Sequence, residues 1–372
     1  MYQKKKLIVF SYDFPPSNGG IARLCQEIAV GMKPYYESVK VLTRKKEGVN
    51  VPYNLKEVEI ISFPSKRLVC ELAILKYLSK IKDKNNYTVI CGTWHPEATL
   101  SLCAGFKNVF ILGHGTELIG GSSFFRKNIW LRHYAKFILN NVKLTIANSN
   151  YTRNLVKELS PSANSVALPL GVNHSFFRPL LNFGAESNII KICSVSRIEQ
   201  FKGHDFIATV LAKLPENFRN QIEWNIAGTG EYLSELKKII YDLGIDNIVN
   251  FHGFVNDSDL PAFYNSNDLF ILCSRENHNN IYVEGFGLVF LEAQSCGIPV
   301  IGTNTGGIGD AISDGNGGWL ITQDNVKELY DIIEAILIDK SMVKSMGKKA
   351  RNRVLDGYTW EIYCHKLNKL IN

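Results

Sequence analysis

The chain has 372 residues, enough for two domains that each bury a full core. Its hydrophobic content of 45% and charged content of 21% exclude a disordered chain, and no apolar run approaches the roughly 20 residues of a membrane-spanning helix. The eight cysteines show no Cys-x-x-Cys pair and no metal-ligand spacing. We therefore expect a reduced intracellular chain with buried thiols, not a disulfide or zinc scaffold.

Charge is divided unevenly along the chain. Residues 1–180 carry 25 Lys and Arg against 11 Asp and Glu, a net of +14. From the totals of 42 and 35, residues 181–372 carry 17 against 24, a net of −7. Residues 118–157 contain seven basic and no acidic side chains. This asymmetry indicates an anionic partner for the first half only.

Strand-like runs alternate with helical patterns through the first half. The first run follows three lysines, as in a signal peptide, but it is too short and leads into Asp13-Phe14-Pro15-Pro16, so a buried strand is expected instead. The expected strands are Leu7–Phe10, Val39–Thr43, Val89–Cys91, Val109–Leu112, Leu144–Ala147 and Ser165–Leu168, and the helical patterns include Ile21–Met32, Cys70–Ile81 and Trp130–Leu139.

A linker with Pro and Gly punctuation, from Pro169 to the polar stretch ending at Ser187, separates this half from a second one of the same plan. Its expected strands are Ile190–Val195, Glu223–Ala227, Ile248–His252, Leu269–Cys273, Val300–Gly302 and Gly318–Ile321. Its expected helices are Phe206–Lys213, Tyr232–Leu243, Asp259–Asn265, Leu288–Ser295 and Val326–Ile338.

This alternation predicts an α/β protein of two Rossmann-like domains, each a doubly wound parallel sheet, facing each other across a cleft. We expect an N-terminal domain over residues 1–174 and a C-terminal domain over 175–358, with a last helix over 359–372 packed back on the first domain. Ligands in such folds bind at the carboxyl ends of the strands.

Two glutamates, Glu284 and Glu292, enclose the run Gly285-Phe286-Gly287-Leu288 between two apolar segments. A glycine-rich loop therefore opens a helix at the end of a strand, where unpaired N–H groups favour a phosphate or a sugar hydroxyl. Two carboxylates beside it are suited to accept paired hydroxyl donors, as sugar and ribose binding requires.

Other polar and glycine motifs follow the expected strands. Arg197 and Lys202 lie on one strand-end loop, where two cations can clamp a diphosphate, although a solvated loop is the plainer alternative. His114, flanked by glycines, is either exposed to a ligand or a satisfied structural histidine. Gly19-Gly20 allows close backbone approach to a ligand or is an ordinary turn, and Gly228-Thr229-Gly230 lines a nucleotide pocket or is a plain strand–helix turn. The strand end Gly253-Phe254-Val255 presents its backbone to a base edge or is simply an edge of the sheet.

The ordered set of these motifs, ending at Gly306-Gly307, resembles the motif series of retaining GT-B glycosyltransferases of family four (glycosyl transferases group 1), which includes bacterial mannosyl and hexosyl transferases. The resemblance covers nearly the whole chain. It implies that Glu284 and the backbone of Gly285 to Leu288 bind the donor sugar, that Glu292 binds the ribose hydroxyls, that Arg197 and Lys202 hold the diphosphate, and that His114 meets the sugar near the reacting carbon.

The polar stretch Glu276-Asn277-His278-Asn279-Asn280 departs from the family pattern. A histidine among asparagines raises the possibility of a metal, but a flexible loop is the preferred interpretation. The resemblance implies front-face attack, with the leaving diphosphate accepting the acceptor's proton, so the protein mainly orients the reactants and stabilises charge. No cofactor and no metal are expected, because Arg197, Lys202 and a helix dipole can neutralise the leaving group.

The resemblance thus implies a hexosyltransferase that uses a nucleotide-diphosphate sugar, with GDP-mannose favoured over UDP-sugars, and a glycan or lipid-linked acceptor in cell-envelope polysaccharide or glycolipid synthesis. The alternatives are a nucleotide-sugar 2-epimerase and a non-catalytic subunit that only binds a sugar nucleotide or a membrane.

The basic first half predicts a cytoplasmic protein, peripheral on the inner face of the cell membrane, with an anionic membrane surface and no nucleic acid as partner. The segment expected to dock as a basic amphipathic helix contains Phe124, Phe125, Trp130 and Phe137 interleaved with Arg126, Lys127, Arg132 and Lys136. A helix packed on the sheet with a solvated basic face is the alternative.

Overall fold

The computed structural model describes residues 5–17, 19–45, 58–180, 188–277 and 281–372. The polar linker after Leu180 and the His278-Asn279-Asn280 part of the departing stretch lie outside these residues. The chain forms two compact units. Unit 1 contains Met1–Leu170, His278–Ile281 and Trp360–Asn372, and unit 2 contains Gly171–Asn277 and Tyr282–Thr359.

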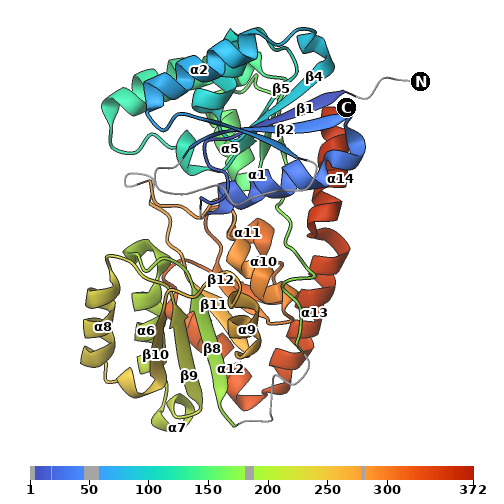
Figure 1. Cartoon of the computed structure of the whole chain (residues 1–372). Helices are drawn as coiled ribbons and strands as arrows, with labels where there is room; N and C mark the ends of the chain where they lie inside the picture. Colours follow the sequence, from blue (N-terminus) through green and yellow to red (C-terminus); the bar gives the residue numbers. More distant parts are fainter. Residues whose placement is uncertain (1–4, 18, 46–57, 181–187, 278–280) are drawn as a thin grey trace. The chain divides into compact units, whose positions relative to one another are not determined.

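Unit 1 is built on a seven-stranded sheet in the order β3-β2-β1-β4-β5-β6-β7, with every pair parallel (Figure 1). The strands are β1 (Lys6–Phe10), β2 (Ser38–Arg44), β3 (Glu59–Phe63), β4 (Tyr87–Cys91), β5 (Val109–Gly113), β6 (Leu144–Ala147) and β7 (Ser165–Ala167).

Helices connect these strands, as parallel pairing requires. The helices of unit 1 are α1 (Gly20–Gly31), α2 (Arg67–Ser79), α3 (Thr99–Cys103), α4 (Lys136–Asn141), α5 (Asn150–Leu159) and the C-terminal α14 (Trp360–Ile371). They are joined by the short 3-10 helices η1 (Lys33–Tyr35), η2 (Lys84–Asn86) and η4 (Thr116–Leu118) and by the π-helical segments η3 (Trp94–Ala98) and η5 (Arg126–Ala135). The last helix packs on the first helix of this unit, where a Cβ at Gly31 would lie 2.5 Å from Cys364 Sγ.

Unit 2 is built on a six-stranded parallel sheet in the order β10-β9-β8-β11-β12-β13. Its strands are β8 (Ile190–Val195), β9 (Ile222–Ala227), β10 (Val249–Gly253), β11 (Leu269–Leu272), β12 (Val300–Thr303) and β13 (Gly318–Ile321). Its helices are α6 (His204–Ala212), α7 (Glu216–Arg219), α8 (Leu233–Asp242), α9 (Leu260–Asn265), α10 (Leu288–Ser295), α11 (Ile308–Ala311), α12 (Val326–Ile338) and α13 (Ser341–Gly357), with turns η6 (Gln200–Lys202) and η7 (Asp246–Ile248).

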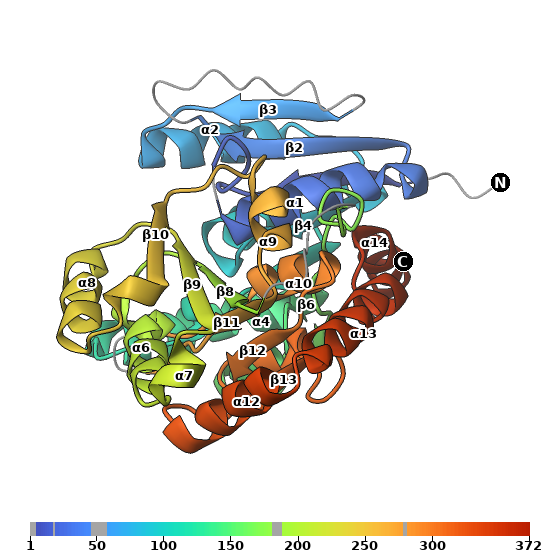
Figure 2. The same ribbon diagram turned by 90° about the horizontal axis from the view of Figure 1, so that it is seen from below.

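The unit 2 sheet is buried on both faces, because successive side chains of a strand alternate between them. Leu269 and Ile271 of β11 join a core cluster with residues of α6, α8 and α12. Phe270 points to the opposite face, where its ring lies 6.1 Å from that of Tyr264 in α9 and 5.3 Å from that of Phe290 in α10. Figure 2 shows these two groups of helices on either side of the strands.

Two parallel sheets with connecting helices confirm the predicted α/β fold of two Rossmann-like domains. The sequence missed β3 in unit 1 and the helices α7, α11 and α13 in unit 2, and the expectation of buried thiols was wrong for Cys103. All eight cysteines are free, but Cys103, the last residue of the short helix α3, is exposed. In the described residues no helix is long and apolar enough to cross a membrane.

Candidate functional site

The chain order of the unit 2 strands reverses between β8 and β11. From β8 the chain proceeds outward through β9 and β10, then returns to β11 on the other side of β8. Loops on either side of such a reversal separate at the carboxyl ends of the strands and leave a crevice that ligands use. The loops at this point include residues 196–203 after β8 and residues 273–277 and 281–287 after β11, and they carry Arg197, Lys202 and the predicted run from Glu284 to Gly287.

Lys202 and Glu284 are brought together at this point. Lys202 Nζ lies 2.6 Å from Glu284 Oε2, and the two side chains are only 12% and 19% exposed. The same ammonium lies 4.7 Å from the centre of the Phe201 ring, which stacks on Tyr282 at 5.0 Å and an interplanar angle of 10°. A cation and a carboxylate therefore lie together where the strand order reverses, with the cation against a packed aromatic ring, an arrangement suited to phosphate and sugar binding.

Glycines bring the two loops close to each other and to the strands. Gly203 has φ +76°, and a Cβ there would lie 2.0 Å from the carbonyl oxygen of Cys273. Gly287, with φ +87°, precedes the first residue of α10, and a Cβ there would lie 2.6 Å from the Phe290 ring. Neither position tolerates a side chain, so the close approach of these loops depends on glycine.

The start of α10 offers backbone donors beside Glu284. Gly285 and Leu288 are half-buried at the start of this helix, whereas the Phe286 ring is buried in the core at 2% exposure. The part of Phe286 that a ligand could meet is therefore its backbone. The carbonyl of Glu284 accepts a 2.8 Å hydrogen bond from the N–H of Gly307, which ties the predicted Gly306-Gly307 turn to the same site.

Glu292 is only 3% exposed, on the second turn of α10. Its Oε2 accepts a 3.0 Å hydrogen bond from the hydroxyl of Tyr264, which is fully buried. Burial and the neighbouring Glu292 carboxylate raise the pKa of Tyr264 well above its usual value, so the phenol keeps its proton and donates.

Arg197 and Lys202 have separate partners in this structure. The Arg197 side chain is 75% exposed, and its guanidinium pairs with Glu199 two residues along the same loop. The sequence expected both cations to hold one diphosphate, and the structure places only Lys202 against Glu284.

A network that the sequence did not reveal supports these loops. Arg275 donates to Asp205 Oδ1 at 2.8 Å, to Asp324 Oδ1 at 2.8 Å and to the Gln200 carbonyl at 3.1 Å. Asp324 has φ +56°, a conformation that non-glycine residues adopt at a cost and that often marks a functional region. The only sequence signal was a charged residue directly after a buried strand, because its partners lie 49 to 75 residues away.

The other predicted glycines lie at the ends of β9 and β10. The N–H of Gly228 donates to the carbonyl of Gly253 at 2.7 Å, which joins these strand ends. Phe254 is 64% exposed beside the half-buried Val255, so both face the solvent at this edge of the sheet.

Three predicted site residues belong to unit 1. Gly19 precedes α1, and Gly20 is its first residue. His114 follows β5, where its Nε2–H donates to the carbonyl of Gly92 at 2.7 Å and its backbone N–H donates to Glu117 at 2.6 Å. The His114 ring is therefore oriented by the loop that follows β4, the neighbouring strand.

That loop also carries the buried Glu97, which the sequence did not single out. Glu97 is 2% exposed and accepts hydrogen bonds from the Tyr12 N–H at 3.1 Å and the Thr93 hydroxyl at 2.5 Å. Burial raises the pKa of Glu97 to about 7.

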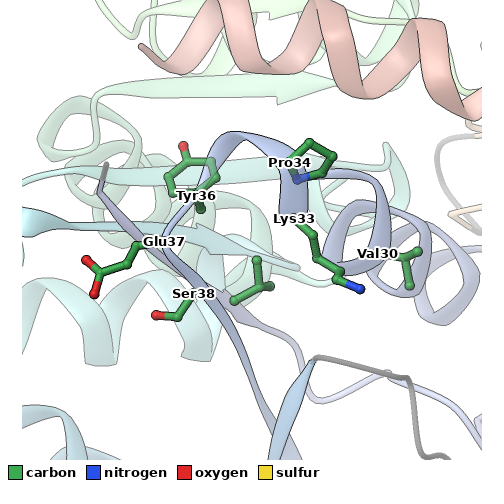
Figure 3. Close-up of a pocket in the computed structure, with 7 residues that line it drawn as sticks. Val30, Lys33, Pro34, Tyr36, Glu37 and Ser38 are labelled. Atoms are coloured by element: carbon green, nitrogen blue, oxygen red, sulfur yellow. The ribbon is translucent and has the colours of Figure 1, made fainter. Parts of the chain in front are cut away.

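Figure 3 shows an open pocket of about 410 Å³ elsewhere in unit 1. It lies at the amino-terminal start of β2, opposite the end of the strand at which ligands bind in these sheets. None of the predicted site residues lines it. Its lining residues are Val30, Lys33, Pro34, Tyr36, Glu37, Ser38 and Val39.

Among the described residues, no group of three or more His, Cys, Asp and Glu side chains could hold a metal ion. The predicted polar stretch contributes Glu276, whose Oε2 accepts from the N–H of Gly306 at 2.9 Å, and Asn277, whose backbone pairs with that of Tyr282.

Among the comparisons with known proteins, the family model matches one part of the chain and full-length relatives match nearly all of it. Residues 182–353, which make up most of unit 2, match the family model of glycosyl transferases group 1. The whole chain is similar to a GDP-mannose-dependent alpha-(1-6)-phosphatidylinositol monomannoside mannosyltransferase of Mycolicibacterium smegmatis, with 26% identity over 98% of both chains. It is also similar to a monoacylated-substrate counterpart of Corynebacterium glutamicum, with 25% identity over 100% of this chain and 99% of the other.

Among solved structures, HepE of Anabaena in complex with UDP superposes with a TM-score of 0.80 and 18% identity over 99% of both chains. At this identity the likeness concerns the fold. Taken with the two parallel sheets, the family match over residues 182–353 and the full-length mannosyltransferase relatives support a GT-B glycosyltransferase, and the part of the chain that carries the Lys202–Glu284 site is similar to the glycosyl transferases group 1 family.

Proposed function

We propose that this glycosyltransferase moves a mannosyl group, with retention of configuration and without a metal, from GDP-mannose to a lipid-linked glycan acceptor. The observation that carries the proposal is the Lys202–Glu284 pair at the β8/β11 crevice beside the start of α10. It supplies a cation for a diphosphate, a carboxylate for sugar hydroxyls and helix N–H groups for either.

The choice of GDP-mannose rests on relatives. The mycobacterial and corynebacterial proteins that align over the whole chain are named for GDP-mannose and for phosphatidylinositol mannoside acceptors. HepE was solved with UDP, but its 18% identity supports the shared fold and does not identify a base. We therefore assign guanine as the donor base from the relatives that are more similar and align over their full length.

In the proposed site Lys202 stabilises the charge that develops on the leaving diphosphate, and Arg197 adds a second cation once the donor is bound. Glu284 and the backbone of Gly285, Phe286, Gly287 and Leu288 hold the sugar hydroxyls. The acceptor's proton passes to the departing phosphate oxygen as the new glycosidic bond forms on the same face. The remaining donor contacts come from Gly19, Gly20, Gly228, Gly253, Phe254, Val255, Glu292 and, near the reacting carbon, His114.

Membrane association is part of the proposal, because the acceptor is carried on a lipid. Phe124, Phe125 and Phe137 are 75%, 60% and 61% exposed on the basic segment of unit 1. Leu68 and Leu72 of α2 are similarly exposed, at 74% and 69%. Exposed apolar side chains flanked by lysine and arginine are suited to the interface of an anionic bilayer. We expect the protein at the inner face of the cell membrane.

The test is incubation of the whole protein with GDP-mannose, GDP-glucose, UDP-glucose and UDP-N-acetylglucosamine, with and without a lipid-linked mannoside and with and without EDTA. We expect GDP-mannose to raise the melting temperature most, since a ligand that binds only the native state stabilises it. Release of GDP should depend on the acceptor, survive EDTA and give a product with the donor's anomeric configuration by NMR.

Other outcomes separate the alternatives. A change at C2 of the donor sugar without transfer would indicate an epimerase. Binding without turnover, in the presence of every acceptor tried, would indicate a non-catalytic subunit. Loss of activity with EDTA, restored by a divalent cation, would contradict the metal-independent mechanism.

A further inference from the structure

The Tyr264–Glu292 contact joins two helices on one face of the unit 2 sheet. Tyr264 lies on α9 and Glu292 on α10, and the hydroxyl donates to Oε2 at 3.0 Å. Both residues are buried, at 0% and 3% exposure. A carboxylate in such surroundings needs hydrogen-bond donors to offset its lost hydration, and each donor also fixes its orientation.

The Tyr264 ring is itself fixed by packing. Its centre lies 6.0 Å from that of Phe177 and 6.1 Å from that of Phe270, with interplanar angles of 69° and 53°. Because the ring has no room to swing, its hydroxyl presents one fixed donor to Glu292. The carboxylate position is thus determined by α9 as well as by its own helix.

We propose that Tyr264 is a positioning residue for ribose recognition: it holds the Glu292 carboxylate in the orientation that accepts the 2′ and 3′ hydroxyls of the donor nucleotide. This inference rests on the proposed role of Glu292 and extends it to a residue on a different helix. If the inference holds, the preference of the protein for a ribonucleotide over a dideoxynucleotide depends on both Tyr264 and Glu292, not on Glu292 alone.

The experiment measures dissociation constants of GDP and of 2′,3′-dideoxy-GDP by calorimetry for the whole protein and four variants. The variants are Tyr264→Phe, Glu292→Gln, the double variant, and Tyr330→Phe as control. Tyr330 is matched because its hydroxyl also donates to a glutamate, Glu334 at 3.2 Å, within α12. Donor kcat and KM are measured alongside.

We expect the native protein to prefer GDP by about tenfold or more and Tyr264→Phe to reduce that preference about three- to tenfold, mainly by weaker GDP binding. KM for the donor should rise with kcat little changed, because the ribose is remote from the reacting carbon. Adding Tyr264→Phe to Glu292→Gln should cost nothing further, since the hydroxyl acts through the carboxylate. Tyr330→Phe should behave as the native protein.

Phenylalanine keeps the ring and its packing, so the fold should survive. If Tyr264→Phe is less stable, the ratio of the two constants from one preparation still reports recognition, because the active fraction cancels. If Glu292→Gln abolishes the preference while Tyr264→Phe retains it, the positioning role is wrong and the ribose assignment stands. If Glu292→Gln also retains the preference, the ribose assignment itself fails.

Discussion

Lys202 and Glu284 are 82 residues apart in the chain, yet Lys202 Nζ lies 2.6 Å from Glu284 Oε2. The pair joins the loop after β8 to the loop after β11, the two strands between which the chain order reverses. In the proposed function, a diphosphate that binds to Lys202 would replace the carboxylate as partner of the ammonium and would leave Glu284 able to accept sugar hydroxyls. The pair would then link phosphate binding to sugar binding.

Lys202→Ala should lower kcat roughly 10²–10³-fold, because the charge on the leaving diphosphate grows in the transition state and loses its nearest cation. Nucleotide binding should weaken less than turnover falls. Lys327→Ala is the control, since Lys327 pairs with Asp331 on the exposed surface of α12. Full turnover with weakened donor binding would contradict the proposed role.

Arg197→Ala should also lower turnover, but less than Lys202→Ala does, because the Arg197 side chain is 75% exposed and paired with Glu199. Steady-state kinetics of both single variants and of the double variant would compare them. An effect of Arg197→Ala larger than that of Lys202→Ala would mean that donor binding reorganises this loop and makes the arginine the main phosphate ligand.

His114→Ala should reduce transfer strongly while the fold remains. The variant loses one hydrogen bond from Nε2 to the Gly92 carbonyl, worth about 1 kcal/mol net. That corresponds to a fall in melting temperature of about 2–4 °C for a unit of this size. Calorimetry and a transfer assay check both values. Strong destabilisation with normal specific activity would assign His114 a purely structural role.

Glu97 gives a pH prediction. Burial raises its pKa from 4.5 to about 7, so the folded chain holds the proton more tightly than the unfolded chain. The contribution of the protonated Glu97 to the free energy of unfolding is present below about pH 4.5 and is lost as the pH rises through about 7. At about 1.4 kcal/mol per pKa unit, the loss by pH 8 is about 3 kcal/mol.

Urea unfolding of the native protein and of Glu97→Gln between pH 4.5 and 8 is the measurement. The glutamine variant should show a smaller fall in unfolding free energy with pH. Glu27, whose pKa burial also raises to about 7, contributes equally to both proteins and cancels in the comparison. Parallel curves would show that Glu97 does not titrate in this range.

The sequence predicted the strands of unit 2 closely, because four of them, β8, β9, β11 and β12, are short segments buried along most of their length, as in the interior of a parallel sheet. It missed β3, whose residues Glu59 to Ser62 are half-buried or exposed at the edge of the sheet, and α13, whose surface is rich in lysine and arginine. The sequence also placed Lys202 and Glu284 at strand ends in one donor site, but it did not predict that the two side chains pair.

The sequence did not predict which residues form hydrogen bonds with the site residues. Tyr264 is 28 residues from Glu292, and Arg275 is 70 residues from Asp205. Such pairings depend on how helices and loops pack over the sheet, and the spacing of residues along the chain does not indicate them. The same limit affected Trp130, predicted to face a membrane.

Trp130 is half-buried among other rings, which leaves less of its side chain to meet a bilayer. Its ring centre lies 4.8 Å from that of Tyr134, 4.9 Å from that of His95 and 5.6 Å from that of Trp94. Arg126 is likewise occupied, because it donates to the carbonyls of Ile119 and Thr116 at 2.8 and 3.0 Å.

The residues left to meet a bilayer are the exposed Phe124, Phe125 and Phe137 with Lys127, Arg132 and Lys136. The last prediction is that the protein binds anionic vesicles reversibly through them. Each basic residue near such a surface contributes roughly 1 kcal/mol, so neutralising all three to glutamine should weaken binding about 100-fold at low salt.

Sedimentation with vesicles of phosphatidylcholine alone, or with added phosphatidylserine, at low and high salt measures this binding. Phe124→Ser with Phe125→Ser should weaken it as well, through lost apolar insertion, whereas Tyr241→Ser, an equally exposed aromatic at 73% on unit 2, should leave it unchanged. Binding that ignores both lipid charge and salt, or that survives both sets of substitutions, would remove the membrane from the proposal and make a soluble acceptor the better hypothesis.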